Sequence, residues 1–208
     1  MKQSIIYFTV IFLSISTSFA QMKKMENVDS FVKQMEQNTS SVKSIESDFK
    51  QIKHIDAFNQ DIVSSGKFYY YKVNDKICLN YVMPRPYLVL MNSSKIKIES
   101  EGKKNVMNLK DNKQMQEMHN MLKVCMTGKL SNISKDYRME FYEDGQYYLI
   151  IVKPVNESAN KYILDVYLNK KDMSIDKLRI SESESDYTEY HFINKKLNTL
   201  SNDTLFKI

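Results

Sequence analysis

The chain has 208 residues, of which 42% are hydrophobic and 26% are charged, so it can bury one sizeable core and is not disordered throughout. Its formal net charge of +5 is spread along the sequence rather than collected in one block. Such a dispersed excess favours solubility and suits weak contact with anionic membrane surfaces.

Residues 1–20 have the pattern of a secretory signal peptide. A lone Lys2 precedes an apolar run over residues 5–13, and the segment ends in the small-x-small sequence Ser18-Phe19-Ala20. A retained membrane anchor needs about 20 apolar residues, and this run is shorter. We therefore predict a signal peptide over residues 1–20 and a single mature domain over residues 21–208.

The expected mature chain has no Cys at its start to carry a lipid, and it has no second apolar run that could span a bilayer. We therefore expect a soluble, exported protein. Export also argues against nucleic acid as a partner, and we expect the protein to act as a monomer.

Residues 28–39, VDSFVKQMEQNT, place apolar side chains at helical spacing and predict a short amphipathic helix. Most of the remaining sequence consists of short segments rich in β-branched and aromatic residues, separated by Asn, Asp, Pro, Ser and Gly, which is typical of strands with antiparallel neighbours. Residues 143–146 have the composition of a hairpin turn. The predicted strands cover residues 44–55, 61–73, 76–83, 86–92, 94–100, 136–143, 146–154, 161–169, 174–183 and 186–194.

So many consecutive strands predict a mainly β (α+β) fold. We expect an unclosed antiparallel β-barrel, or strongly curled half-barrel, of about ten strands in one meander, with an N-terminal helix and a mid-chain helix. Alternation gives the sheet two unlike faces: Phe68 and Tyr70 share one face, as do Ile77, Leu79 and Tyr81. These side chains either fill a packed core or line a cavity, and the pattern leaves both outcomes open.

The mid-chain helix is predicted over residues 113–128, KQMQEMHNMLKVCMTG, and is rich in methionine. Its apolar stripe comprises Met115, Met118, Met121, Leu122 and Cys125. The stripe is either a permanent plug in the core of the sheet or a lid over changing apolar ligands, for which flexible Met side chains are well suited.

Patterns typical of catalysis are weak in this sequence. His54, His119 and His191 lie alone in their segments without metal-site spacing, and the chain has no Gly-x-Ser-x-Gly sequence or phosphate loop. We therefore expect no enzyme activity, no cofactor and no metal. Cys78 and Cys125 are the only cysteines, and we predict that they are not joined, because alternation directs Cys78 away from the face that the Met stripe covers.

Short motifs within residues 42–98 carry a family resemblance: Phe49-x-Gln51, Gly66-Lys67-Phe68, and the strand over residues 76–81 followed by Pro84. This segment resembles the first half of the outer-membrane lipoprotein carrier family (LolA), periplasmic chaperones that move lipid-modified proteins between bacterial membranes. The resemblance extends through the mid-chain helix and the later strands. It implies a periplasmic location and an unclosed β-barrel whose helices act as a lid over an apolar cavity that receives acyl chains.

The resemblance also implies roles for individual residues. The mid-chain stripe, Met115, Met118, Met121, Leu122 and Cys125, becomes the lid. The expected cavity residues are large and apolar: Phe31, Met35, Phe49, Phe68, Tyr70, Leu79, Tyr81, Val89 and Met91.

The chain departs from the family pattern at two dipeptides. Family members usually carry Arg-Pro where this chain has Lys72-Val73, and Arg-Trp where it has Cys78-Leu79. The family Arg is associated with holding the lid by hydrogen bonds. Lys72 is therefore the expected residue of lid control, although Lys lacks the planar five-donor fork of Arg. Leu79 in place of Trp widens or reshapes the cavity.

The function implied by the resemblance is that of a carrier that binds lipoprotein acyl chains and transports lipoproteins from the inner to the outer membrane. Its implied partners are an inner-membrane lipoprotein-releasing transporter and an outer-membrane acceptor. The alternative is a periplasmic module of related half-barrel fold that senses lipids or envelope stress and signals through a protein partner.

Overall fold

The computed structural model describes residues 22–58, 60–130, 135–156 and 162–208. For residues 113, 114, 117, 118, 121 and 125, which lie within these ranges, it describes the backbone but not the side chains. The predicted signal peptide, residues 1–20, lies outside the described residues.

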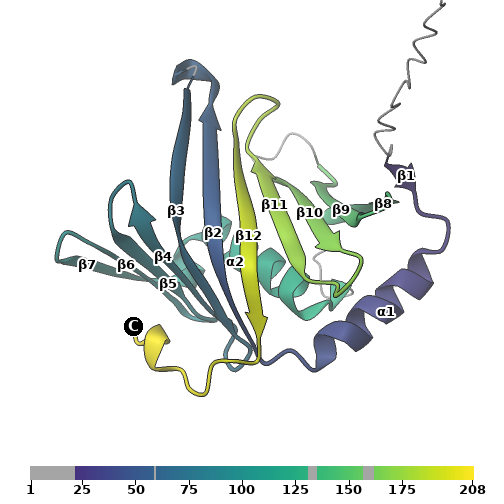
Figure 1. Cartoon of the computed structure of the whole chain (residues 1–208). Helices are drawn as coiled ribbons and strands as arrows, with labels where there is room; N and C mark the ends of the chain where they lie inside the picture. The colour runs from purple at the N-terminus through teal and green to yellow at the C-terminus, as the bar shows by residue number, and fades with distance from the viewer. Residues whose placement is uncertain (1–21, 59, 131–134, 157–161) are drawn as a thin grey trace, which may run out of the picture.

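The described residues form one 12-stranded antiparallel sheet that does not close (Figure 1). All of the predicted strands are present, so the expected mainly β, unclosed architecture is confirmed. The strands are β1 (Lys23–Lys24), β2 (Ser44–Ile55), β3 (Gln60–Tyr71), β4 (Lys76–Met83), β5 (Tyr87–Met91), β6 (Lys95–Ser100), β7 (Lys103–Asn108), β8 (Tyr137–Glu143), β9 (Tyr147–Pro154), β10 (Ile163–Asn169), β11 (Ile175–Ser181) and β12 (Tyr187–Leu197).

Two strands were not expected from the sequence. β1 is only two lysines long and pairs with β8. β7, KKNVMN, has little apolar alternation and is held by its hairpin with β6, whose turn places Glu101 (φ 51°) and Gly102 (φ 76°) in the left-handed region. Pairing geometry rather than composition therefore defines both strands.

The sheet consists of two meanders rather than the expected single one. Its spatial order is β1-β8-β9-β10-β11-β12-β2-β3-β4-β5-β6-β7, so β12 pairs with β2 in the middle. The register of this central pair places Phe192 opposite Phe49 and Tyr190 opposite Gln51. Residues from the two halves of the chain therefore meet on one concave face.

Two helices accompany the sheet: α1 (Val28–Ser40) and α2 (Lys113–Thr127). The side chain of Asn27 caps α1 by accepting from Ser30 N at 3.1 Å, and that of Asn112 caps α2 by accepting from Met115 N at 3.1 Å. Gly128 ends α2 with a φ of 69°. Helix α2 connects β7 to β8, which lie near opposite ends of the strand order. It therefore crosses behind the central strands (Figure 1).

Short 3₁₀ helices complete the fold: η1 (Asp56–Phe58), η2 (Leu109–Asp111) and η4 (Thr204–Phe206). A small second core lies on the convex face, where Phe206 of η4 packs with Cys78 and Leu90. Cys78 is a buried free thiol, as the alternation of β4 predicted. The C-terminal segment is also held by an ion pair of Lys76 with Asp203.

Candidate functional site

The predicted cavity residues all lie in one apolar cluster on the concave face. Phe31 and Met35 come from α1, and the others come from β2 to β5. Leu79 and Val89 are half-buried and pack against this cluster, whereas the remaining members are buried: Phe31, Met35, Phe49, Phe68, Tyr70, Tyr81 and Met91. The part of the concave face that lies beneath the helices, here called its lower part, is thus a packed core.

Residues of the C-terminal half complete the concave face, and the sequence prediction missed them. The ring centroids of Phe192 and Phe68 are 5.0 Å apart, and those of Tyr190 and Phe49 are 6.0 Å apart. The apolar alternation of β12 was visible in the sequence, but its pairing with β2 was not.

Helix α2 is buried on more than one side. Leu122 is buried in the concave cluster and Met115 packs against it, as the stripe predicted, whereas the side chains of Met118, Met121 and Cys125 lie outside the described residues. Outside the predicted stripe, Val124, Met126 and His119 are also buried. The described part of α2 therefore has the packing of a core helix.

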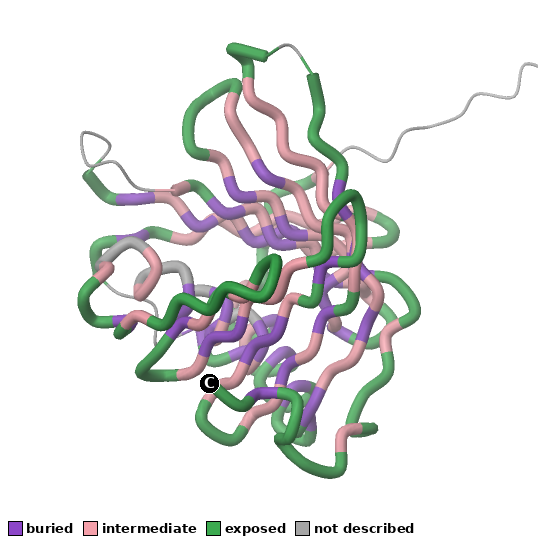
Figure 2. The backbone as a smooth tube through the Cα atoms, turned by 90° about the vertical axis from the view of Figure 1, so that its left-hand side faces the viewer, coloured by how far each residue is buried: buried purple, intermediate pink, exposed green. Residues whose placement is uncertain are grey.

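Burial on the concave face decreases toward the strand ends remote from α2. Along β6, Ile96 is 0% exposed and Ile98, on the same face two residues later, is 37% exposed. Along β3, exposure rises from 3% at Phe68 to 47% at Ile62. Figure 2 shows the same trend, with buried backbone in the middle of the molecule and exposed backbone at the tips of the long strands. An apolar surface thus continues from the core to solvent.

Four aromatic side chains occupy the transition between the buried and the open surface. Phe49 packs edge-on against Tyr81, with ring centroids 4.9 Å apart. Tyr81 stacks on Tyr87 at 3.9 Å and an interplanar angle of 12°. The Tyr81 and Tyr190 hydroxyl oxygens are 3.3 Å apart, and Gln51 Nε2 donates to Tyr190 Oη at 3.2 Å. We call Gln51, Tyr81, Tyr87 and Tyr190 the hydroxyl cluster.

The hydroxyl cluster is uncharged at neutral pH. Burial raises the pKa of Tyr190 to about 12 and raises the pKa of Tyr81 and Tyr87 above the ordinary tyrosine value. The hydroxyl groups therefore stay protonated and act as neutral hydrogen-bond donors within an aromatic surface.

Gly66 allows the aromatic rings to meet. It lies between Phe49 of β2 and Tyr81 of β4 in the register of the sheet, at a bulge in the β3–β4 pairing. A Cβ atom here would lie 2.1 Å from the backbone oxygen of Asn80. The glycine of the Gly66-Lys67-Phe68 motif is thus required by the close approach of β4.

The β3–β4 turn contacts both helices. Lys72 Nζ donates to the Ser40 carbonyl at the end of α1 at 2.9 Å. Asp75 Oδ2 lies 2.6 Å from Lys123 Nζ, and His119 Nε2 lies 3.0 Å from the Asp75 carbonyl oxygen. Lys72, expected as the residue of lid control, thus contacts α1, while Asp75 and His119, which the sequence prediction did not select, contact α2.

The two helices also meet at their C-terminal ends. Thr39 Oγ1 lies 2.8 Å from the carbonyl oxygens of both Met35 and Thr127. A Cβ atom on Gly128 would lie 2.4 Å from Thr39 Oγ1, so glycine permits this contact as well as the left-handed turn. A movement of one helix therefore disturbs the contacts of the other.

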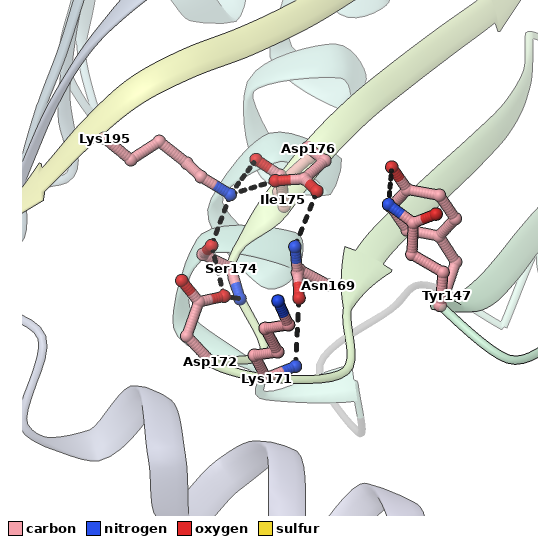
Figure 3. Close-up of polar contacts among 9 residues, drawn as sticks. Tyr147, Asn169, Lys171, Asp172, Ser174, Ile175, Asp176 and Lys195 are labelled. Carbon is pink, nitrogen blue, oxygen red and sulfur yellow. Dashed lines mark hydrogen bonds and ion pairs between the residues drawn. The ribbon is translucent and has the colours of Figure 1, made fainter.

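The convex face has a different character. A pocket of about 550 Å³ over β9 to β12 is lined by charged side chains, among them Asp144 and Lys177, together with Tyr147, Tyr167 and Ile193. Within this lining, Lys195 pairs with Asp176, and it donates to Ser174 Oγ at 2.5 Å (Figure 3). Asn169 Nδ2 donates to the same Asp176 carboxylate at 2.9 Å. These polar and charged groups satisfy one another.

Two further properties concern the described residues as a group. Within them, no cluster of His, Cys, Asp and Glu has the geometry to hold a metal ion. Neither helix in this part of the chain combines the length and the apolar character needed to cross a membrane.

A curled sheet whose concave face is apolar, partly open and crossed by helices defines a binding protein for hydrophobic ligands. The sequence model of the family described as outer membrane lipoprotein carrier protein LolA matches residues 40–208, and the chain belongs to this family. The family is one of carriers rather than enzymes. No curated protein is similar enough in sequence to match the chain.

Two solved structures show the same fold at low sequence identity, and a third match scores lower. A DUF1329 family protein from Desulfovibrio piger has 10% identity and a TM-score of 0.50, with 86% of this chain and 95% of that chain covered. An uncharacterized conserved protein from Thermus thermophilus has 6% identity and a TM-score of 0.50, with 88% and 94% covered. A LolA superfamily protein from Nitrosomonas europaea has 11% identity and a TM-score of 0.46, with 86% and 97% covered.

Proposed function

We propose that the protein is a periplasmic carrier that binds the acyl chains of lipoproteins on its concave face and moves lipoproteins from the inner to the outer membrane. The observation that carries this proposal is the continuity of the apolar surface from the buried cluster through Tyr87 and Val89 to Ile98, which is 37% exposed. A ligand entering over Ile98 meets apolar side chains along its whole path into the core.

Alkyl chains suit such a surface energetically. Each methylene moved from water into an apolar environment contributes about 0.8 kcal/mol, and this contribution needs no exact fit. The surface therefore binds a class of ligand, the acyl chain, rather than one molecule. Aromatic rings and branched aliphatic side chains provide contact area without charges that an alkyl chain would have to desolvate.

Deeper entry of the chains requires the helices to move, because the lower concave face is filled by α1, α2 and the cluster beneath them. The contacts of Lys72 with α1 and of Asp75 with α2 then oppose opening. Cargo is released when an outer-membrane acceptor competes for the chains and the helices return to the core, since a ligand shifts a protein only through its different affinity for two states.

A matched pair of substitutions tests the binding face. Ile98 on the concave face and Val106 on the convex face belong to adjacent strands and are 37% and 49% exposed. Replacing Ile98 by Glu places a charge where the acyl chain binds, and we expect the affinity for a fluorescent fatty-acyl probe to fall at least about tenfold, or about 1.4 kcal/mol. Val106→Glu should leave the affinity unchanged, and equal effects of the two changes would contradict the proposal.

Transport is tested separately from binding. The protein purified from its own envelope fraction should carry triacylated proteins identifiable by mass spectrometry, and it should pass them to outer-membrane vesicles. A protein that binds acyl probes but carries and transfers no lipoprotein would instead fit the alternative, a lipid-sensing module.

A further inference from the structure

We infer that the hydroxyl cluster is a polar subsite that donates a hydrogen bond to an ester or amide carbonyl of the acylated ligand. The inference rests on the proposed function and adds a chemical selectivity to it: recognition of the acyl linkage as well as the hydrocarbon chain.

The three tyrosine hydroxyl groups of the cluster carry more protons than they can bond among themselves. Tyr190, Tyr81 and Tyr87 form a row of three hydroxyl groups, in which Tyr81 contacts Tyr190 through oxygen and stacks on Tyr87. A row of three hydroxyls has at most two internal links, and each link uses one proton, so at least one of the three protons finds no acceptor inside the row. Gln51 contacts the row by donating Nε2 to Tyr190 Oη at 3.2 Å, a bond that takes up none of the three hydroxyl protons.

Apolar side chains surround these hydroxyl groups. Phe49 packs against both Tyr81 and Tyr190, and Val89 and Ile98 continue the same face. A hydrogen-bond donor in an apolar environment favours a ligand that brings an acceptor. Because the cluster is uncharged, a neutral carbonyl suits it better than a carboxylate, which would lose hydration without a cation of the cluster to compensate.

The position of the hydroxyl cluster on the concave face also suits the carbonyl groups of a lipid anchor. The cluster lies where the concave surface passes from fully buried Tyr81, 3% exposed, to half-buried Tyr87 and open Ile98. In a lipid anchor the carbonyl groups lie at the junction between the hydrocarbon chains and the polar backbone. A ligand with its chains toward the core therefore places its carbonyls near this boundary.

Two probes that differ only in the carbonyls test the inference. One is a fluorescent diacylglycerol, and the other is the dialkyl ether glycerol of equal chain length with the same fluorophore. Affinities are measured by titration for the wild type, Tyr87→Phe, Tyr190→Phe and the control Tyr142→Phe. Tyr142 is a matched control because it lies on β8 and donates to Glu140 Oε2 at 3.1 Å.

We expect the wild type to bind the diacyl probe about three- to tenfold more tightly than the ether probe, the range of one hydrogen bond. Tyr87→Phe and Tyr190→Phe should reduce this preference while leaving ether affinity unchanged, because each retains the ring, and Tyr142→Phe should keep it. Equal affinity of the wild type for both probes, or an unchanged preference in both cluster variants, would overturn the inference and leave the proposed function standing. Binding of neither probe would overturn both.

Discussion

Lys123 of α2 and Asp75 of the β3–β4 turn form an ion pair in which Nζ and Oδ2 are 2.6 Å apart. Because Asp75 has a φ of 47°, it lies in the left-handed region that Asn tolerates well, so Asp75→Asn removes the charge without straining the turn. We expect faster hydrogen exchange of the α2 amides and a stability loss of about 1 kcal/mol or less, as for a partly exposed pair. Asp203→Asn, which removes the ion pair with Lys76 on the convex face, is the control and should leave exchange in α2 unchanged.

Gly66 provides a second prediction. Its substitution by Ala brings a Cβ atom against Asn80 O at 2.1 Å, and the backbone of β4 has to move. We expect Gly66→Ala to lower the free energy of unfolding by about 3 kcal/mol or to prevent folding. A Cβ atom added at Gly145 would have no neighbour within 4 Å, so Gly145→Ala should change stability by less than about 0.5 kcal/mol in the same urea titration. Similar values for both variants would refute this account of the motif.

Leu122 tests whether α2 belongs to the core. Its side chain is 8% exposed within the concave cluster, so Leu122→Ala should cost about 2 to 4 kcal/mol in thermal or urea unfolding. Val106→Ala on the exposed part of β7 should cost less than about 0.5 kcal/mol. A small loss for Leu122→Ala would indicate that α2 is loosely held and opens readily.

Cys78 reports on the C-terminal segment. Burial raises the pKa of the Cys78 thiol to about 12, so little thiolate is present at pH 8 and alkylation by iodoacetamide should be slow. Phe206→Ala removes the ring that covers the thiol and should increase its labelling rate, measured at the Cys78 peptide by mass spectrometry. Fast labelling in the wild type would mean that the segment does not protect this face.

The strands were predictable where alternation is strong, and this covers most of the sheet. The α1 helix and its buried Phe31 and Met35 followed from helical spacing, and Asn112 and Gly128 delimit α2 as their residue types suggest. β1 and β7 were missed because their stability comes from hairpin and edge pairing rather than from an apolar face of their own.

The candidate site was predictable only on one side. Every expected strand residue of the cavity came from β2 to β5, because alternation assigns a residue to a face but does not assign a strand to its neighbour. Tyr190 and Phe192 join the site through the β12–β2 pairing, which spans most of the chain. His119 was set aside as an isolated histidine, since its acceptor, the Asp75 carbonyl, is a backbone group that side-chain patterns do not reveal.

The β12–β2 pairing also fixes an order of events during synthesis. The chain delivers β2 to β7 before β12, so one edge of β2 stays unpaired until nearly the whole sequence has emerged. An exposed strand edge of this kind invites pairing with other chains, and long-range pairing is slow to form. The nascent protein, which we propose to be a carrier of other proteins' apolar groups, is thus itself open to such pairing until its last strand arrives.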